Sequence, residues 1–184
     1  LSGQTEGFTI LGAVNYTNGI TGGQGNNTIT GGTLADTLVG LGGDDVITGG
    51  LGADNIDGGA GNDTIVGFTT GDTVEGGGGI DTLKITAPAD AGVISLAPNA
   101  DISNIEIIDA SAATGAITLN LSVQSEAFTV IGSNSDDTIT LNNAANNKVN
   151  GGDGNDTIFG GNSDDFIQGG NGDDSITGGA GADN

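Results

Sequence analysis

A nine-residue repeat constrains this chain more than any other feature. From Gly40 to Val66 the sequence reads GLGGDDVIT, GGLGADNID and GGAGNDTIV, with glycine at the first place, aspartate at the sixth and an apolar residue at the eighth. Glycine permits backbone angles that other residues avoid, so each repeat is interpreted as a loop that turns and then a short strand that buries one side chain. The loop carbonyls and the sixth-place carboxylate are hard oxygen donors, which suit calcium.

The composition argues against a conventional packed globule. Among 184 residues there are 38 glycines and no cysteines, aromatic residues are 3%, and the formal net charge is -22. Crowded carboxylates repel one another, and little apolar burial offsets a backbone entropy cost of about 1–2 kcal/mol per residue. Without counter-charge, the chain is therefore expected to be disordered or loosely collapsed.

The same composition excludes several functional classes. Nucleic acid is not an expected partner, because a basic face is missing when lysine and arginine together number two. The chain contains no histidine and no cysteine, so nucleophilic catalysis by a serine or cysteine with a histidine base is excluded within it. We therefore predict that the chain is not an enzyme. No apolar run reaches membrane-spanning length, and the first residues show no secretory signal pattern.

The nine-residue frame occurs in two blocks related by an offset of 120 residues. The chain is thus interpreted as one 120-residue unit plus the first part of a second, cut from a longer tandem array. We expect four segments: lead-in strands at 1–21, a first repeat block at 22–84, an aliphatic spacer at 85–131 and a second block at 132–184.

The spacer contains short apolar segments, at 93–96, 105–108, 117–121 and 128–131. Their spacing of roughly 10–12 residues predicts further strands. Pro88 and Pro98 are expected in the connecting loops, and no helix is expected anywhere.

Four repeats, GGLGADNID, GGAGNDTIV, GGDGNDTIF and GGNGDDSIT, resemble the RTX nonapeptide G-G-x-G-x-D-x-U-x. The resemblance implies an all-β fold, a right-handed parallel β-roll or β-solenoid in which two nonapeptides make one turn. The two RTX blocks would be joined by a metal-poor solenoid segment. Several calcium ions would lie between glycine loops stacked on the same side, bound by loop carbonyls and sixth-place aspartates. The metal ligands implied are Asp36, Asp45, Asp54, Asp63, Asp72, Asp81, Asp137, Asp156, Asp165, Asp174 and Asp183.

Loops in register are two repeats apart, so the expected sites pair these aspartates along the chain. The pairs are Asp36 with Asp54, Asp45 with Asp63, Asp63 with Asp81, Asp156 with Asp174, and Asp165 with Asp183. Departures from the motif leave other positions open. Asn27 and Asn147 place a neutral oxygen at the sixth place, the loops that end in Asp36 and Asp72 depart from the consensus, and an extra residue separates the repeat of Asp137 from the later frame.

Other interpretations of the same residues stay open at this point. Neighbouring acids such as Asp44 and Asp45 could be paired catalytic carboxylates, and the aspartates could be simple turn residues. Threonine at the seventh place could form a ladder that binds ice or sugar, although it is also a common outward strand residue.

Calcium-coupled folding is the mechanism that these features favour. Divalent ions would neutralise the stacked carboxylates, so that binding free energy becomes folding free energy. The resemblance implies export without a signal peptide, through type I secretion, to an extracellular or cell-surface location. Two roles are retained. One is a structural β-roll of a secreted bacterial surface protein that self-associates, like S-layer proteins, adhesins or filaments. The other is the C-terminal secretion and folding module of a secreted enzyme or toxin.

Overall fold

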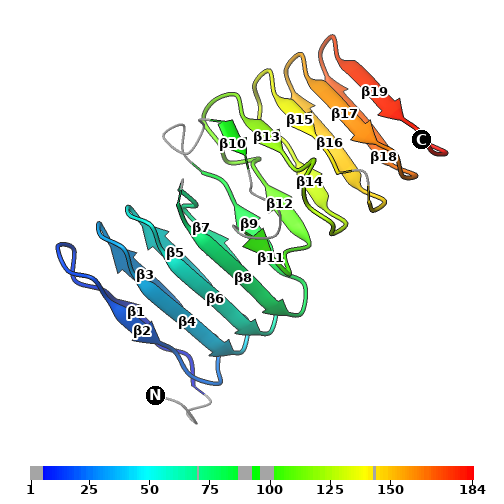
Figure 1. Ribbon diagram of the computed structural model, residues 1–184. Helices are drawn as coiled ribbons and strands as arrows, with labels where there is room; N and C mark the ends of the chain where they lie inside the picture. The colour runs from blue at the N-terminus through cyan, green and yellow to red at the C-terminus, as the bar shows by residue number, and fades with distance from the viewer. Residues whose placement is uncertain (1–5, 70, 87–92, 96–101, 143) are drawn as a thin grey trace. The chain divides into compact units, whose positions relative to one another are not determined.

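The computed structural model describes residues 6–69, 71–86, 93–95, 102–142 and 144–184, with only the backbone described at 93–95. The described residues are all-β and contain no helix, so none is long and apolar enough to cross a membrane. They form two compact units, one of residues 1–84 with 101–105 and the other of residues 85–100 with 106–184. In each unit, parallel strands stack as a β-solenoid (Figure 1). The predicted fold class is confirmed.

The first unit alternates its strands between two parallel sheets. One sheet has the order β1 (Thr9–Leu11), β3 (Thr28–Gly32), β5 (Val46–Gly50), β7 (Thr64–Val66) and β9 (Thr82–Lys84). The other has the order β2 (Gly19–Thr21), β4 (Thr37–Gly42), β6 (Asn55–Ala60), β8 (Thr73–Gly78) and β11 (Ile102–Ser103). Ile47 pairs with Ile65 and Leu38 with Ile56, in each case with the counterpart two repeats later in the chain. Two nonapeptides therefore make one turn here, as predicted.

The second unit repeats this arrangement. One sheet contains β12 (Ile107–Asp109), β14 (Thr129–Ile131), β16 (Lys148–Asp153) and β18 (Phe166–Asn171). The other contains β10 (Val93–Ser95), β13 (Thr118–Asn120), β15 (Thr138–Thr140), β17 (Thr157–Gly161) and β19 (Ser175–Gly179). Thr157 pairs with Ser175, two repeats later, whereas Thr138 pairs with Thr157 across a turn that is longer by one residue. The extra residue predicted after Thr140 thus lengthens one turn without breaking the stack.

The core of the repeat blocks consists of eighth-place side chains, which both sheets contribute. Ile29, Ile47 and Ile65 are fully buried, while the seventh- and ninth-place residues beside them face outward because side chains alternate along a strand. Burying each such side chain stabilises the fold by roughly 1.5–3 kcal/mol. With one per nonapeptide, the apolar core is thin, and loop chemistry has to contribute to the stability of the repeat blocks.

The expected spacer strands are present, as β10, β12, β13 and β14. The described residues of the spacer bury more apolar side chains in each turn than the repeat blocks do. Leu119, Leu121 and Phe128 are all almost fully buried. Residues 1–5 of the lead-in segment, Pro88, Pro98 and Leu96 lie outside the described residues. The division of the chain into lead-in, two blocks and a spacer stays a prediction.

Candidate metal centre

The sixth-place residues form a ladder of hydrogen bonds that runs between stacked loops. The backbone N–H of Asp45 donates to Oδ1 of Asp63 (2.7 Å), and the N–H of Asp63 donates to Oδ1 of Asp81 (2.7 Å). The opposite side of the first unit repeats this from Asp36 to Asp54 and from Asp54 to Asp72, each at 2.8 Å. Each sixth-place carboxylate therefore uses Oδ1 to hold the loop one turn earlier.

The second unit carries the same ladder on its two sides. The N–H of Asp137 donates to Oδ1 of Asp156 (2.8 Å), and that of Asp156 to Oδ1 of Asp174 (2.9 Å). On the other side, the N–H of Asp165 donates to Oδ1 of Asp183 (3.0 Å). The structure therefore brings together all five of the predicted pairs in stacked loops.

The second carboxylate oxygen, Oδ2, is buried without a hydrogen-bond donor in several of these loops. This holds for Asp45, Asp54, Asp63, Asp156 and Asp165. A buried anionic oxygen without a partner costs free energy, since it loses its hydration and gains nothing in return. These five atoms are the least satisfied polar groups of the candidate centre, and a cation beside them would relieve the cost.

A carbonyl oxygen of the loop one turn later lies close to the first-place glycine beside Oδ2 of Asp45, Asp63, Asp156 and Asp165. A Cβ added to Gly58, the first residue of its repeat, would lie 2.5 Å from Oδ2 of Asp63 and would also overlap the carbonyl oxygen of Gly76. Gly40 has the same surroundings, with Oδ2 of Asp45 and the carbonyl oxygen of Gly58. Only a residue without a side chain leaves this space open, so the first-place glycine creates a small cradle lined by oxygen atoms from two successive loops.

Glycine is favoured at the second place for a different reason. Gly59 and Gly77 have φ of +104° and +107°, a backbone conformation that L side chains rarely adopt. Leu41 occupies the same place in its repeat and has φ of +81°. The glycine frame thus fixes both the loop conformation and the open cradle.

Three loops that depart from the motif satisfy Oδ2 internally. The N–H groups of Gly32, Thr69 and Ser133 each donate to Oδ2 of the aspartate in their own loop, at 2.6 Å. The three aspartates so engaged are Asp36, Asp72 and Asp137. They belong to the ladder, but their second oxygen already has a donor, which leaves them less suited to a cation than the consensus loops.

The two sixth-place asparagines act as donors toward their neighbours. Nδ2 of Asn27 donates to Oδ1 of Asp45 (3.0 Å), and Nδ2 of Asn147 donates to Oδ1 of Asp165 (3.1 Å). Asn18 does the same for Asp36 (2.8 Å), which extends the ladder one repeat before the predicted start of the first block. The signal in the sequence was the pairing of Asn18 at the sixth place with Ile20 at the eighth.

Burial of stacked carboxylates perturbs their acidity. Burial is the main reason that the pKa of Asp63 rises to about 6. The hydrogen bond from the N–H of Asp45 lowers this pKa, whereas the negative charges of Asp45 and Asp81 raise it further. Burial is also the main cause of the raised pKa values of Asp45, Asp54, Asp72 and Asp156. All five shifts point to negative charge held where the protein supplies too little compensation.

A second ladder, at the fifth place, was missed by sequence reasoning. The N–H of Asn62 donates to Oδ1 of Asp44 (2.8 Å), and the N–H of Asp173 donates to Oδ1 of Asn155 (2.8 Å). Here each side chain accepts from the loop one turn later, the opposite direction to the sixth-place ladder. The repeated Asp or Asn at the fifth place of several loops was the available signal. These exposed side chains link loops that lie one turn apart. Asp44, the acidic neighbour of Asp45, therefore has a structural role.

The donor set fits a hard divalent cation. Within the described residues, no three acidic side chains converge on one point, so an ion would need backbone carbonyls beside the carboxylates. The cradles supply this combination, with a donor-free Oδ2 and a carbonyl oxygen of the next loop. Calcium accepts six to eight oxygen ligands of mixed carboxylate and carbonyl type in flexible geometry.

Comparison with known proteins agrees with this geometry. A family model of the RTX calcium-binding nonapeptide repeat matches residues 16–33, 30–65, 66–84 and 150–184. The chain belongs to the RTX calcium-binding nonapeptide repeat family. The RTX matches cover the glycine loops of the first unit and those of the second unit from residue 150 onward, and the resemblance drawn from the motifs is confirmed. No curated protein matches the chain. RTX repeats bind calcium, and in this chain they form a β-roll.

Proposed function

We propose that this chain is a calcium-folded structural β-roll of a secreted bacterial surface protein. The observation that carries the proposal is the stack of sixth-place carboxylates with a buried, donor-free oxygen, in a chain of formal charge -22. Calcium bound beside these oxygens would supply the missing positive charge and link successive loops. Since the thin apolar core stabilises the roll only in part, the free energy of calcium binding becomes free energy of folding.

The proposed ligands differ in strength along the chain. Asp45, Asp54, Asp63, Asp156 and Asp165 are the strongest, because Oδ2 is buried and has no donor. Asp81, Asp174 and Asp183 accept the same ladder bonds through Oδ1. Asp36, Asp72 and Asp137 are proposed as weaker ligands, since a loop N–H already occupies Oδ2.

Calcium dependence of folding gives the direct test. With a chelator, circular dichroism should report mainly coil, and calcium at about 10⁻⁴ to 10⁻³ M, the affinity range of extracellular modules, should produce a β-sheet spectrum. Magnesium at equal concentration should be less effective, because it demands a smaller octahedral site and gives up its water reluctantly. A full β-sheet spectrum in chelator at neutral pH would contradict the proposal.

Support for a structural surface role comes from the repetition of the 120-residue unit, which suits an extended array. Such an array is proposed to be extracellular, exported by type I secretion, and to self-associate as S-layer proteins, adhesins or filaments do. Electron microscopy with and without calcium tests this role, and calcium-dependent ordered assemblies are expected. Calcium-dependent folding without assembly would favour the alternative, a C-terminal secretion and folding module of a secreted enzyme or toxin.

A further inference from the structure

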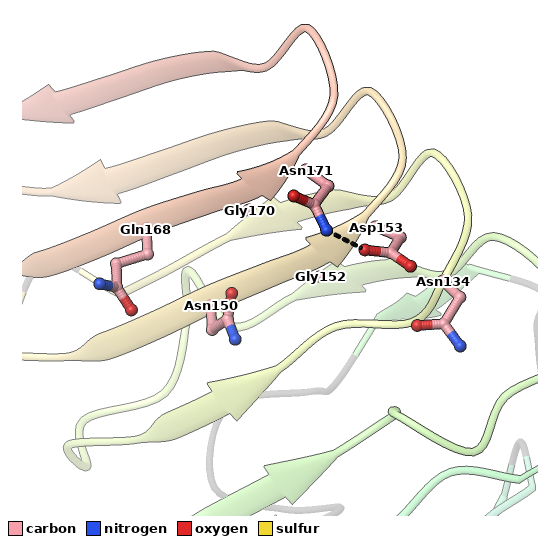
Figure 2. A pocket seen from close by; sticks show the side chains of 7 residues that line it. All are labelled: Asn134, Asn150, Gly152, Asp153, Gln168, Gly170 and Asn171. Atoms are coloured by element: carbon pink, nitrogen blue, oxygen red, sulfur yellow. Dashed lines mark hydrogen bonds between the residues drawn. The ribbon is translucent and has the colours of Figure 1, made fainter.

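A groove lies on the outward face of β16 and β18 in the second unit, away from the sixth-place aspartates. It encloses about 500 Å³. Figure 2 shows Asn150 and Gln168 on one side of Gly152 and Gly170, and Asn134, Asp153 and Asn171 on the other. The groove therefore has two polar walls and a floor of bare backbone.

The floor exists because the glycine frame forbids side chains there. Gly152 and Gly170 have φ of +114° and +119°, and a Cβ at Gly170 would overlap the carbonyl oxygen of Gly152. Asn150 and Asp153 are three residues apart on β16, which separates the walls by about 10 Å at the rise of an extended strand. That width admits one sugar ring or a similarly small polar group.

The walls present unused hydrogen-bonding groups. Within the described part of the chain, the side-chain amides of Asn134, Asn150 and Gln168 make no hydrogen bond to the protein. Nδ2 of Asn171 donates to Oδ1 of Asp153 (2.7 Å), which orients both side chains at the rim (Figure 2). Each amide offers two N–H donors and one carbonyl acceptor, a combination that matches adjacent hydroxyl groups, which are themselves donors and acceptors.

The first unit carries the same scaffold without these amides. An offset of 120 places Thr30 and Thr48 where Asn150 and Gln168 stand, and Val14, Thr33 and Leu51 where the other wall stands. The glycines of the floor are retained, as Gly32 and Gly50. Because β3 and β5 form their turns without amides, the amides of the second unit are not required by the fold.

We propose that this groove binds a neutral oligosaccharide. Vicinal hydroxyls would bridge the amides of the two walls. Asp153 in the wall and the formal charge of -22 disfavour acidic sugars. This site is independent of the proposed calcium ligands, although it needs the folded roll.

The test uses the full chain folded in calcium, with maltohexaose, cellohexaose and mannohexaose as neutral probes and hexagalacturonate as the acidic probe. At least one neutral probe should shift the side-chain NH₂ resonances of Asn150 and Gln168 saturably in two-dimensional NMR, and hexagalacturonate should not. The proposal is overturned if no neutral probe gives saturable shifts, or if the acidic probe binds equally well.

Variants separate the groove from general surface effects. Asn150→Thr with Gln168→Thr installs the residues of the first unit and should weaken binding about tenfold or more, since two neutral hydrogen-bonding groups are lost. Asn162→Thr changes an exposed amide outside the groove and should bind like the unaltered chain. Equal binding by the double variant would refute the assignment; if that variant failed to fold, the shifts in the unaltered chain would still decide.

Discussion

Replacement of Asp63 by asparagine should move calcium-free and calcium-bound folding in opposite directions. Asp63 is 1% exposed, its Oδ1 accepts the N–H of Asp45, and its Oδ2 has no donor. Asparagine keeps the Oδ1 acceptor and removes the charge. Without calcium, the variant no longer buries an uncompensated carboxylate, so its folded state should be stabilised relative to that of the unaltered chain.

The size of this gain follows from the acidity of Asp63. A rise of the pKa from 3.8 to about 6 is worth roughly 3 kcal/mol, and screening by nearby water reduces this to about 1–3 kcal/mol at neutral pH. With calcium, the same change removes a charged ligand. The calcium concentration for half-folding should then rise about tenfold, because ligand charge sets the affinity of such sites.

Circular dichroism measures both effects in one protein. In chelator, trimethylamine N-oxide, which favours burial, should fold Asp63→Asn at a lower concentration than the unaltered chain. In a calcium titration, the variant should need more calcium. Asp57→Asn makes the same charge change on an outward position of β6 and should leave the calcium midpoint nearly unchanged. Either of two results would refute the reasoning. One is a calcium midpoint of Asp63→Asn that shifts no more than that of Asp57→Asn. The other is an Asp63→Asn variant whose folding shifts in the same direction with calcium and without it.

Three further predictions follow from the two ladders. Asp72→Asn should raise the calcium midpoint far less than Asp63→Asn, because the N–H of Thr69 already occupies Oδ2 of Asp72; equal shifts in calcium titrations would contradict this. Asp44→Ala should cost about 0.5–1.5 kcal/mol in urea unfolding with calcium, since the N–H of Asn62 loses its acceptor, whereas Asp44→Asn should restore most of the stability. In chelator, the β-sheet signal should increase as the pH falls through about 6 toward 4. Folding raises the pKa of Asp63, so protonation of this side chain favours the folded state. This stabilisation is fully present below the pKa of the unfolded state and is lost as the pH rises through the pKa of the folded state. A calcium-free chain that loses β-sheet structure on acidification would show that the sign is wrong.

Much of the roll could be predicted from the period of nine. Each strand lies within a single repeat of the sequence. Eighth-place residues such as Ile47 and Ile65 pair because the repeat places them one full turn apart. The same period selects the sixth-place aspartates and stacks them. It also marks Asp36, Asp72 and Asp137 as lying in irregular repeats. Register, core and candidate ligands thus follow from the sequence because in a solenoid every residue contacts its counterpart one turn away.

What each side chain does within that stack was decided by the tertiary structure. The repeat does not reveal that Oδ1 of Asp63 accepts a hydrogen bond from the loop one turn earlier while Oδ2 is left without a donor. Nor does it reveal that the N–H of Thr69 donates to Oδ2 of Asp72. The fifth-place ladder and the groove beside Asn150 are equally invisible in the motif. These features depend on the direction of single oxygen and nitrogen atoms between loops, and those directions are fixed only when successive turns pack against one another.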